Sequence, residues 1–221
     1  PPRRLKPREY GITAINDVGV PTGELCHILE DFDQYADFAK LGIGSAYLIK
    51  DLKRKLDIYR RFDIPVCFGG TLFEKYYHQN KLDDYRLFMK DVGLQWVEVS
   101  HGTVNIPIGK LMDVISLLEE DFNVVAEVGK KRMDKIPDPA QWTNDIDRLL
   151  KAGVRYVVLE GRNSADAGIY NPDGSLRREL VSSITTRIDS RRLIFEAPTA
   201  KSQIQLIRLL GPNVNLGNVL I

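Results

Sequence analysis

Residues 124–162 contain a complete strand–helix–strand unit, which begins with VVAEVGKK at 124–131 and ends with YVVLEGR at 156–162. Both ends are short runs rich in apolar and β-branched residues, as in strands that are buried on both faces of a parallel sheet. Between them, Asp138-Pro139 is a favourable helix start and Gly153 a favourable helix end. The helix predicted here has a buried face that consists of Trp142, Ile146, Leu149 and Leu150.

The same pattern extends along the chain in both directions. Helical spacing recurs between the apolar runs, as in Leu52, Leu56 and Tyr59, or in Ile204, Ile207 and Leu210 before Gly211. The eight candidate strands are residues 11–17, 36–42, 64–70, 96–102, 124–131, 156–162, 193–198 and 214–220.

Eight strands alternating with helices predict a (β/α)₈ TIM barrel of parallel strands, a single α/β domain over residues 1–221. An open doubly wound sheet is the alternative, but no glycine-rich phosphate fingerprint follows the first strand. The chain ends at Ile221, at the end of the eighth strand. We therefore expect residues 1–221 to lack the eighth helix, which is either missing or lies beyond this sequence.

Composition excludes several classes of protein. The 31 Lys and Arg residues balance 30 Asp and Glu residues, so the chain lacks the basic excess of a nucleic-acid-binding protein. No apolar run approaches the roughly 20 residues of a membrane helix, and the N-terminus lacks a signal-peptide pattern. Cys26 and Cys67 form no disulfide framework or metal motif. We expect a cytoplasmic protein with no nucleic-acid or membrane partner.

Charged and polar residues follow the predicted strands at the end where TIM barrels carry their active sites. A charge inside an apolar strand is costly unless it is paired or binds an ion, so these residues predict one shared polar site. Strand parity places Glu127 and Lys131 on one face and Lys130 on the other. The set comprises Asp17, Lys40, Gly70, Thr71, Glu98, His101, Glu127, Lys130, Lys131, Glu160, Arg162, Glu196, Asn215 and Asn218.

Four glutamates with nearby cations predict a particular chemistry. Carboxylates without histidine or thiolate partners favour a hard cation such as Mg²⁺, and Lys and Arg suit an anionic substrate. Mg²⁺ with a cation and a phosphate- or carboxylate-bearing substrate is an enolate-stabilising combination. For any single Glu–Lys or Glu–Arg pair the alternative is a structural ion pair, and for His101 it is a polar residue at a strand end. The charged run at 50–61 is most simply a solvated helix face.

The ordered motifs resemble those of the phosphosulfolactate synthase family, known from the pathways to coenzyme M and other sulfonates. The resemblance spans nearly the whole chain. It is carried by KLGIGS at 40–45, GGTLFE at 69–74, VEVS at 97–100, EVGKK at 127–131, EGR at 160–162, FEAP at 195–198 and GPNVNLGN at 211–218.

The resemblance implies a (β/α)₈ lyase that adds sulfite to phosphoenolpyruvate with Mg²⁺, giving 2-phospho-3-sulfolactate, and that self-associates. On this basis Lys131 is the candidate proton donor, with Lys130 and Glu98 as further catalytic residues. The candidate metal ligands are Asp17, Glu127, Glu160 and Glu196. The candidate substrate-binding residues are Lys40, Gly70, Thr71, His101, Arg162, Asn215 and Asn218.

The sequence departs from the family pattern at several of these positions. Val18 stands where the family usually has lysine, and His101 where it usually has aspartate. These departures leave two alternatives to the synthase. One is a divergent barrel enzyme that uses phosphoenolpyruvate or a related phospho-acid with a different nucleophile. The other is a non-catalytic family member.

Overall fold

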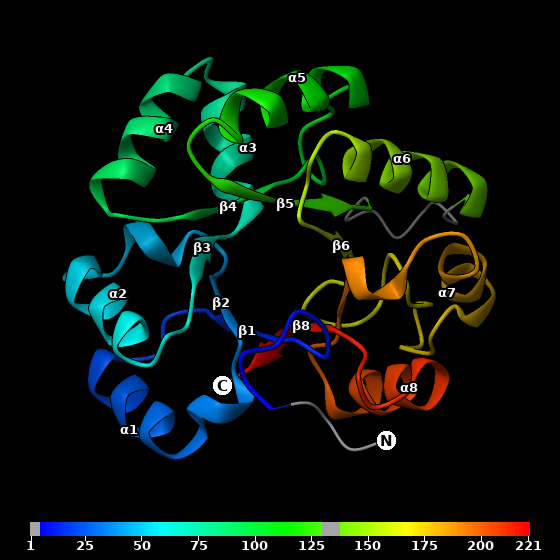
Figure 1. The fold of residues 1–221 in the computed structure, drawn as a ribbon, viewed down its shortest axis with the longest axis horizontal. Coiled ribbons are helices and arrows are strands. Elements are labelled where there is room, and N and C mark those ends of the chain that lie inside the picture. The colour runs from blue at the N-terminus through cyan, green and yellow to red at the C-terminus, as the bar shows by residue number, and fades with distance from the viewer. Residues whose placement is uncertain (1–4, 130–137) are drawn as a thin grey trace.

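The chain folds into a barrel of eight parallel strands surrounded by helices (Figure 1). The computed structural model describes residues 5–129 and 138–221. The strands are β1 (Thr13–Asp17), β2 (Phe38–Leu41), β3 (Val66–Phe68), β4 (Trp96–Val99), β5 (Asn123–Val128), β6 (Tyr156–Leu159), β7 (Leu193–Glu196) and β8 (Leu216–Leu220). All eight fall within or next to the predicted ranges, which confirms the (β/α)₈ fold.

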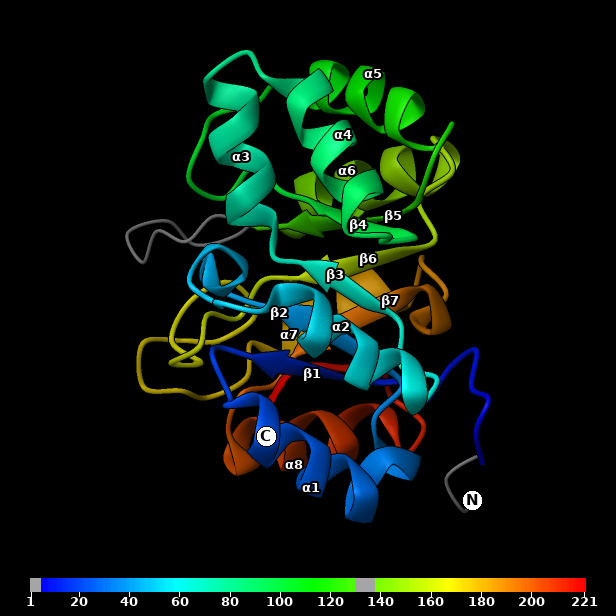
Figure 2. The ribbon, with the colours of Figure 1, turned by 90° about the vertical axis from the view of Figure 1, so that its left-hand side faces the viewer.

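The helices fill the connections between consecutive strands, and Figure 2 shows α3, α4 and α5 on one flank of the barrel and α1 and α8 on the other. Because α3 and α4 both lie between β3 and β4, the chain has eight α-helices although none follows β8 in the described part. They are α1 (Thr22–Phe32), α2 (Leu52–Arg61), α3 (Gly70–His78), α4 (Leu82–Asp91), α5 (Ile108–Leu118), α6 (Pro139–Lys151), α7 (Arg178–Thr185) and α8 (Ala200–Leu210).

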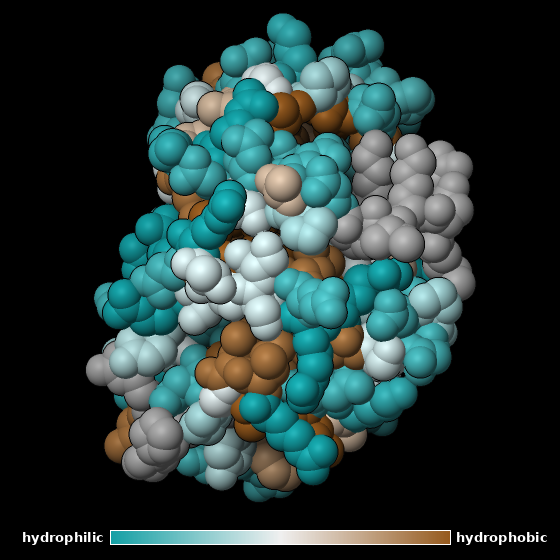
Figure 3. All heavy atoms as spheres, turned by 90° about the vertical axis from the view of Figure 1, so that its right-hand side faces the viewer, coloured by the Kyte–Doolittle hydropathy of each residue, from teal (hydrophilic) through white to brown (hydrophobic). Residues whose placement is uncertain are grey.

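Helix α6 forms as its sequence predicts. Helix α8 buries a different face from the one that carries Ile204 and Ile207. Asp138 caps α6 by accepting a hydrogen bond from the Ala140 amide, and Trp142 and Ile146 are buried. In α8 the buried residues are Ser202 and Leu206. Ile204 and Ile207, whose spacing predicted this helix, are 48% and 40% exposed. Figure 3 shows apolar atoms at the level of α8 on an otherwise largely hydrophilic face. None of the helices described has the length and apolar character needed to span a membrane.

The sheet has one seam, between β3 and β4. The strand order runs β3-β2-β1-β8-β7-β6-β5-β4, so these two strands are the ends of the hydrogen-bonded sheet. They lie next to each other, but no ladder joins them among the described residues. Since β3 has only three residues, it offers few backbone groups for pairing. The barrel is therefore nearly, but not fully, closed by backbone hydrogen bonds.

The barrel interior is apolar toward the amino ends of the strands and polar toward their carboxyl ends. A small cluster of Ile12, Val125, Tyr156, Val158 and Ile194, with Phe38 and Trp96 packed against it, fills the lower part. Side chains alternate along a strand, so the residue two positions after each inward apolar residue also points inward. By this rule Glu127, Glu160 and Glu196 stand above Val125, Val158 and Ile194, at the carboxyl ends of their strands.

Asp17, at the end of β1, is an anchor for helix α2 on the outer side of the sheet. Its Oδ2 atom lies 2.6 Å from Lys55 Nζ and accepts a hydrogen bond of 2.8 Å from the Tyr59 hydroxyl. Its Oδ1 atom accepts bonds of 2.9 Å from the amides of Gly19 and Val20. Lys55 is 1% exposed, so the charged run at 50–61 is not simply a solvated face.

Glu74, on α3, holds the connection that leaves β4. Its carboxylate accepts hydrogen bonds from the hydroxyls of Ser100 and Thr103 and from the amides of Gly102, Thr103 and Val104. Burial raises the pKa of Glu74, but these donors outweigh burial and leave the pKa below its usual value. The buried charge therefore fixes the backbone at one edge of the barrel opening.

The ion pair of Asp17 and Lys55 predicts a selective loss of stability. We expect Lys55→Met to lower the free energy of unfolding by about 3 kcal/mol, because it leaves a buried carboxylate without its cation. The measurement is urea denaturation at neutral pH. The control is Lys53→Met on the same helix, where the side chain is 69% exposed; we expect a change below about 0.5 kcal/mol. Equal losses in both variants would contradict this assignment.

Glu74 predicts a pH-dependent contribution to stability. A carboxyl group with a lowered folded-state pKa stabilises the protein above its unfolded pKa of about 4.3, and the contribution disappears as the pH falls through the folded value. Glu74→Gln should therefore destabilise the protein by about 2 kcal/mol at pH 7, and its difference from the wild type should shrink below pH 4. Glu24→Gln, at an exposed position of α1, is the control. A difference that is constant with pH would refute the role of the charge.

Candidate active site

A pocket of about 530 Å³ opens at the carboxyl ends of the strands. This is the position at which TIM barrels carry their active sites. Its walls include side chains from several strands and from the connections that follow β2, β3 and β6. The charged and amide residues of the lining are Asn16, Lys40, Lys75, Glu98, Glu127, Glu160, Arg162, Asn163, Glu196 and Asn218.

Lys40 is the central cation of the pocket. Its Nζ atom lies 3.2 Å from Glu196 Oε1 and 3.4 Å from Glu98 Oε2, and its side chain is 12% exposed. Burial alone would lower the pKa of Lys40, but the charges of Glu98, Glu196 and Glu127 outweigh burial and hold the pKa well above its usual value. The side chain therefore carries its positive charge at neutral pH.

The two carboxylates that flank Lys40 are also held by backbone amides. Glu98 Oε1 accepts a bond of 2.7 Å from the Gly70 amide. Glu196 accepts bonds from the Gly161 amide at 2.8 Å and from Asn218 Nδ2 at 2.5 Å. A Cβ atom at position 70 would lie 2.5 Å from Ser100 Oγ, so glycine is needed for this approach. The positions of both carboxylates are thus fixed by their surroundings.

Glu160 and Glu196 form a close carboxyl pair. Burial raises the pKa of Glu196, whereas the Lys40 charge, the Gly161 amide and a hydrogen bond with the Glu160 side chain lower it, and the net effect is a lowered pKa. Glu160 Oε1 also accepts a bond of 2.7 Å from the Arg162 amide. Two carboxyl groups that share a hydrogen bond need a shared proton or a nearby cation.

Two further cations lie at the rim. Arg162 has a positive φ of 56°, so it has left the strand geometry, and its Nη1 atom lies 3.6 Å from Asp166 Oδ1. Lys75 Nζ lies 4.4 Å from the centroid of the Tyr47 ring. Both side chains line the pocket, so its opening is more basic than its interior.

Most of the predicted site residues meet in this pocket. Those that line it are Lys40, Gly70, Thr71, Glu98, Glu127, Glu160, Arg162, Glu196 and Asn218. Lys130 and Lys131 lie outside the described residues. His101, predicted to bind substrate, does not line the pocket. It lies near Asp145 of α6, where burial raises the pKa of the carboxyl group and the proximity of His101 only partly offsets that effect.

Two predicted residues have structural roles elsewhere. Asp17, a candidate metal ligand, points away from the pocket and uses both oxygens for Lys55, Tyr59 and two amides. Asn215, a candidate substrate ligand, precedes β8 and thus lies at the opposite end of the barrel. Its side chain binds the amides of Gly11 and Ile12 and the carbonyls of Arg191 and Leu193. We therefore remove both residues from the candidate site.

Eleven of the lining residues were not among the predicted site residues, and they include Asn16, Tyr47, Lys75 and Asn163. Lys75 carried a usable signal, because it stands four residues after Thr71 on α3 and so lies on the same helix face. Asn16 lies next to Asp17 but on the inward side of β1, and its Nδ2 atom donates a bond of 3.3 Å to Asn163 Oδ1. Asn163 and Tyr47 belong to irregular connections, where strand and helix periodicity give no orientation.

The oxygen-rich lining does not form a ready-made metal cage. Within residues 5–129 and 138–221, no three His, Cys, Asp or Glu side chains come together closely enough to hold a metal ion by themselves. Two buried amide oxygens, Asn16 Oδ1 and Asn218 Oδ1, have no hydrogen-bond partner.

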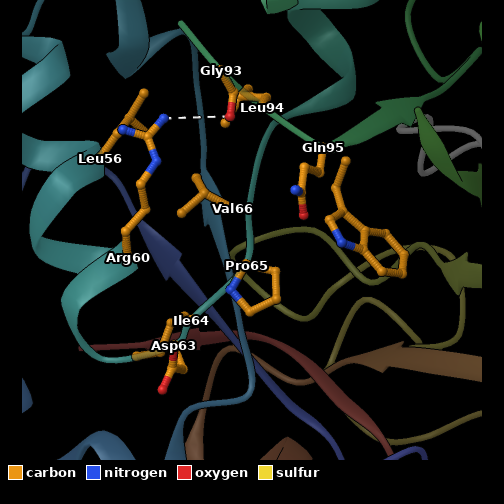
Figure 4. Close-up of a pocket in the computed structure, with 10 residues that line it drawn as sticks. Leu56, Arg60, Asp63, Ile64, Pro65, Val66, Gly93, Leu94 and Gln95 are labelled. Atoms are coloured by element: carbon orange, nitrogen blue, oxygen red, sulfur yellow. Dashed lines mark hydrogen bonds between the residues drawn. The ribbon is translucent and has the colours of Figure 1, made fainter. Parts of the chain in front are cut away.

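A second cavity, of about 330 Å³, lies at the other end of the β3–β4 seam. Figure 4 shows Arg60 on one side of this cavity, with its guanidinium directed at the backbone of Gly93, and Gln95 on the other side. Arg60 Nη2 donates bonds to the carbonyls of Val92 at 2.8 Å and Gly93 at 3.3 Å. The buried glutamates do not line this cavity, so we place the candidate active site in the first pocket.

Comparisons with known proteins identify the family of the chain. The sequence pattern of the (2R)-phospho-3-sulfolactate synthase family matches residues 1–221. The chain is 36% identical to the phosphosulfolactate synthase of Methanothermobacter thermautotrophicus over 225 residues, covering 99% of this chain and 87% of the relative. It is 35% identical to the Bacillus subtilis enzyme of the same name, with coverages of 99% and 88%.

A solved structure supports the fold alone. The carboxyl transferase domain of Rhizobium etli pyruvate carboxylase superposes with a TM-score of 0.65 at 10% identity. The match covers 97% of this chain but only 40% of that one. The family is shown instead by the sequence relatives and by the pattern that spans residues 1–221. On these grounds, the chain belongs to the (2R)-phospho-3-sulfolactate synthase family.

Proposed function

We propose that this protein adds sulfite to phosphoenolpyruvate, with Mg²⁺, to give 2-phospho-3-sulfolactate. The observation that carries this proposal is the family match over residues 1–221. A pocket that combines buried carboxylates with three cations, Lys40, Lys75 and Arg162, supports it. We also keep the cytoplasm as the proposed compartment, supported by two cysteines that form no disulfide, and self-association as an expectation from the family.

The proposed reaction forms one bond and moves one proton. The sulfur lone pair of sulfite attacks the methylene carbon of phosphoenolpyruvate, and a carbon–sulfur bond forms. The electrons of the carbon–carbon double bond move toward the carboxylate, which becomes an enolate. A proton then adds to the carbon that bears the phosphate. The protein must therefore stabilise charge at the carboxylate and deliver a proton to one carbon.

The donor set of the pocket fits Mg²⁺. Magnesium is usually held by one or two carboxylates together with water and substrate oxygens, so a three-acid cluster is not required. We assign it to Glu127 and Glu160, with the buried amide oxygen of Asn218 nearby in the lining. The close pair of Glu160 and Glu196 supports this choice, because a cation relieves the repulsion between two carboxylates. When bound, the ion would supply positive charge for the developing enolate.

Protein groups supply the remaining requirements. Lys40 is the deepest cation, and we assign it to the end of the substrate where the enolate charge develops, since its ammonium is held in place by Glu98 and Glu196. Arg162, at the rim, is the candidate for the phosphate, which guanidinium binds through two parallel hydrogen bonds. Lys131, which follows β5 in the sequence, remains the candidate proton donor.

An activity assay tests the proposal directly. Purified protein incubated with phosphoenolpyruvate, sulfite and Mg²⁺ should form phosphosulfolactate, detected by mass spectrometry, and a chelator should abolish product formation. Lys131→Ala should also abolish it. Phosphoenolpyruvate binding without sulfite consumption would favour an enzyme with a different nucleophile. Failure to bind either anion would favour a non-catalytic family member.

The Lys40 ion pairs predict a large catalytic effect. We expect Lys40→Met to lower kcat/KM for phosphoenolpyruvate by roughly 100-fold or more, because two buried carboxylates lose their cation and the substrate loses its deepest positive charge. Lys50→Met, at an exposed position in the connection that follows β2, is the control. Circular dichroism should show the same fold in both variants. A folded Lys40→Met protein with wild-type kcat/KM would contradict the role of Lys40.

A further inference from the structure

The charge of the pocket changes with depth. The four lining glutamates are between 1% and 3% exposed, and the Lys40 ammonium is already shared between Glu98 and Glu196. A phosphate monoester carries close to two negative charges at neutral pH. Placing it among these carboxylates would bring like charges together in a poorly solvated site. The phosphate is therefore more stable near the rim, where Lys75 and Arg162 lie.

Lys75 is held at this rim by an aromatic support. Its ammonium lies over the Tyr47 ring, 4.4 Å from the centroid, within the range of a favourable cation–π contact. The Tyr47 ring is stacked on Phe88, with centroids 6.0 Å apart and an interplanar angle of 6°. Lys75 is thus restrained although it is exposed. Among residues whose placement is described, it makes no ion pair within 4.0 Å.

The surroundings of Lys75 suit an oxyanion. Lys75 and Thr71 are four residues apart on α3, and both line the pocket. Thr71 lies in the first turn of this helix, where the helix dipole and the backbone amides favour negative charge. Arg162 lines the same pocket from the connection after β6. These groups come from separate parts of the chain and together provide two cations and a hydroxyl.

We propose that Lys75, restrained by Tyr47, forms with Arg162 and Thr71 a clamp for the phosphate of a phospho-acid substrate. The identity of that substrate rests on the proposed function, whereas the clamp itself requires only a phosphate monoester. Lys75 is in this view a specificity-determining residue. It contacts the phosphate, and the bonds that form and break lie deeper, beside Lys40.

The first test compares Lys75→Met with Lys81→Met, which removes an exposed lysine outside the pocket lining. Lys75→Met should raise KM for phosphoenolpyruvate by roughly tenfold, as expected for the loss of one charge-assisted contact, and should affect kcat less. The Kd for phosphoenolpyruvate from titration calorimetry should rise by a similar factor. Lys81→Met should leave both constants at their wild-type values.

The second test examines the aromatic support. Tyr47→Phe keeps a ring beneath Lys75 and should weaken phosphoenolpyruvate binding less than Tyr47→Leu does. Tyr47→Leu removes the ring and should raise the Kd several-fold. Combining Tyr47→Leu with Lys75→Met should add little to Lys75→Met alone, because the ring acts through the lysine. Additive effects would show that Tyr47 does not act by positioning Lys75.

The remaining outcomes separate the clamp from the proposed function. If Lys75→Met raises KM for sulfite instead of phosphoenolpyruvate, the phosphate assignment is overturned. If it leaves the Kd of phosphoenolpyruvate and of inorganic phosphate unchanged, the clamp is refuted. If the wild type makes no phosphosulfolactate but Lys75→Met still weakens phosphoenolpyruvate binding, the clamp stands and the proposed reaction fails.

Discussion

The placement of one lysine between two carboxylates organises the polar end of the barrel. Lys40 on β2 reaches Glu98 on β4 and Glu196 on β7, so three strands that are far apart in the strand order are joined by charge. A buried charge is tolerated only when it is paired and hydrogen-bonded, and here both carboxylates also bind backbone amides. Because these groups are held before any substrate arrives, the pocket has a fixed electrostatic pattern.

The interior and the rim of the pocket differ in charge, and each suits a different part of the substrate. The interior combines carboxylates with a single shared ammonium, which suits a metal ion and a carboxylate that gains charge during reaction. The rim offers Lys75, which lies over the Tyr47 ring, and Arg162, which lies near Asp166; two cations suit the phosphate. In the proposed reaction the substrate carries both kinds of group, so one molecule can bridge the two levels.

The sequence allowed the fold and most of the pocket to be predicted, because β-strand alternation is regular. Lys40, Glu98, Glu127, Glu160 and Glu196 interrupt apolar strands, and each points inward. Alternation fails where the chain offers two adjacent polar residues. At the end of β1, Asn16 faces the pocket and Asp17 faces α2, and both neighbours would satisfy the pattern equally well.

Asn215 was misplaced for another reason: β8 begins one residue later, so its side chain lies at the opposite rim. Lys55 escaped notice because its buried partner is distant in sequence.

Residues at the active site also help to close the barrel at the β3–β4 seam. Backbone pairing is missing there among the described residues. The hydrogen bonds that cross it include those donated by the Gly70 amide to Glu98 and by the Ser100 hydroxyl to Glu74. Glu98 of the pocket and Glu74 of α3 thus hold β3 and β4 together where backbone pairing is missing. Glu98 consequently contributes both to the geometry of the pocket and to the contact between β3 and β4. Evolution cannot remodel Glu98 for new chemistry without also finding another way to keep the two edges together.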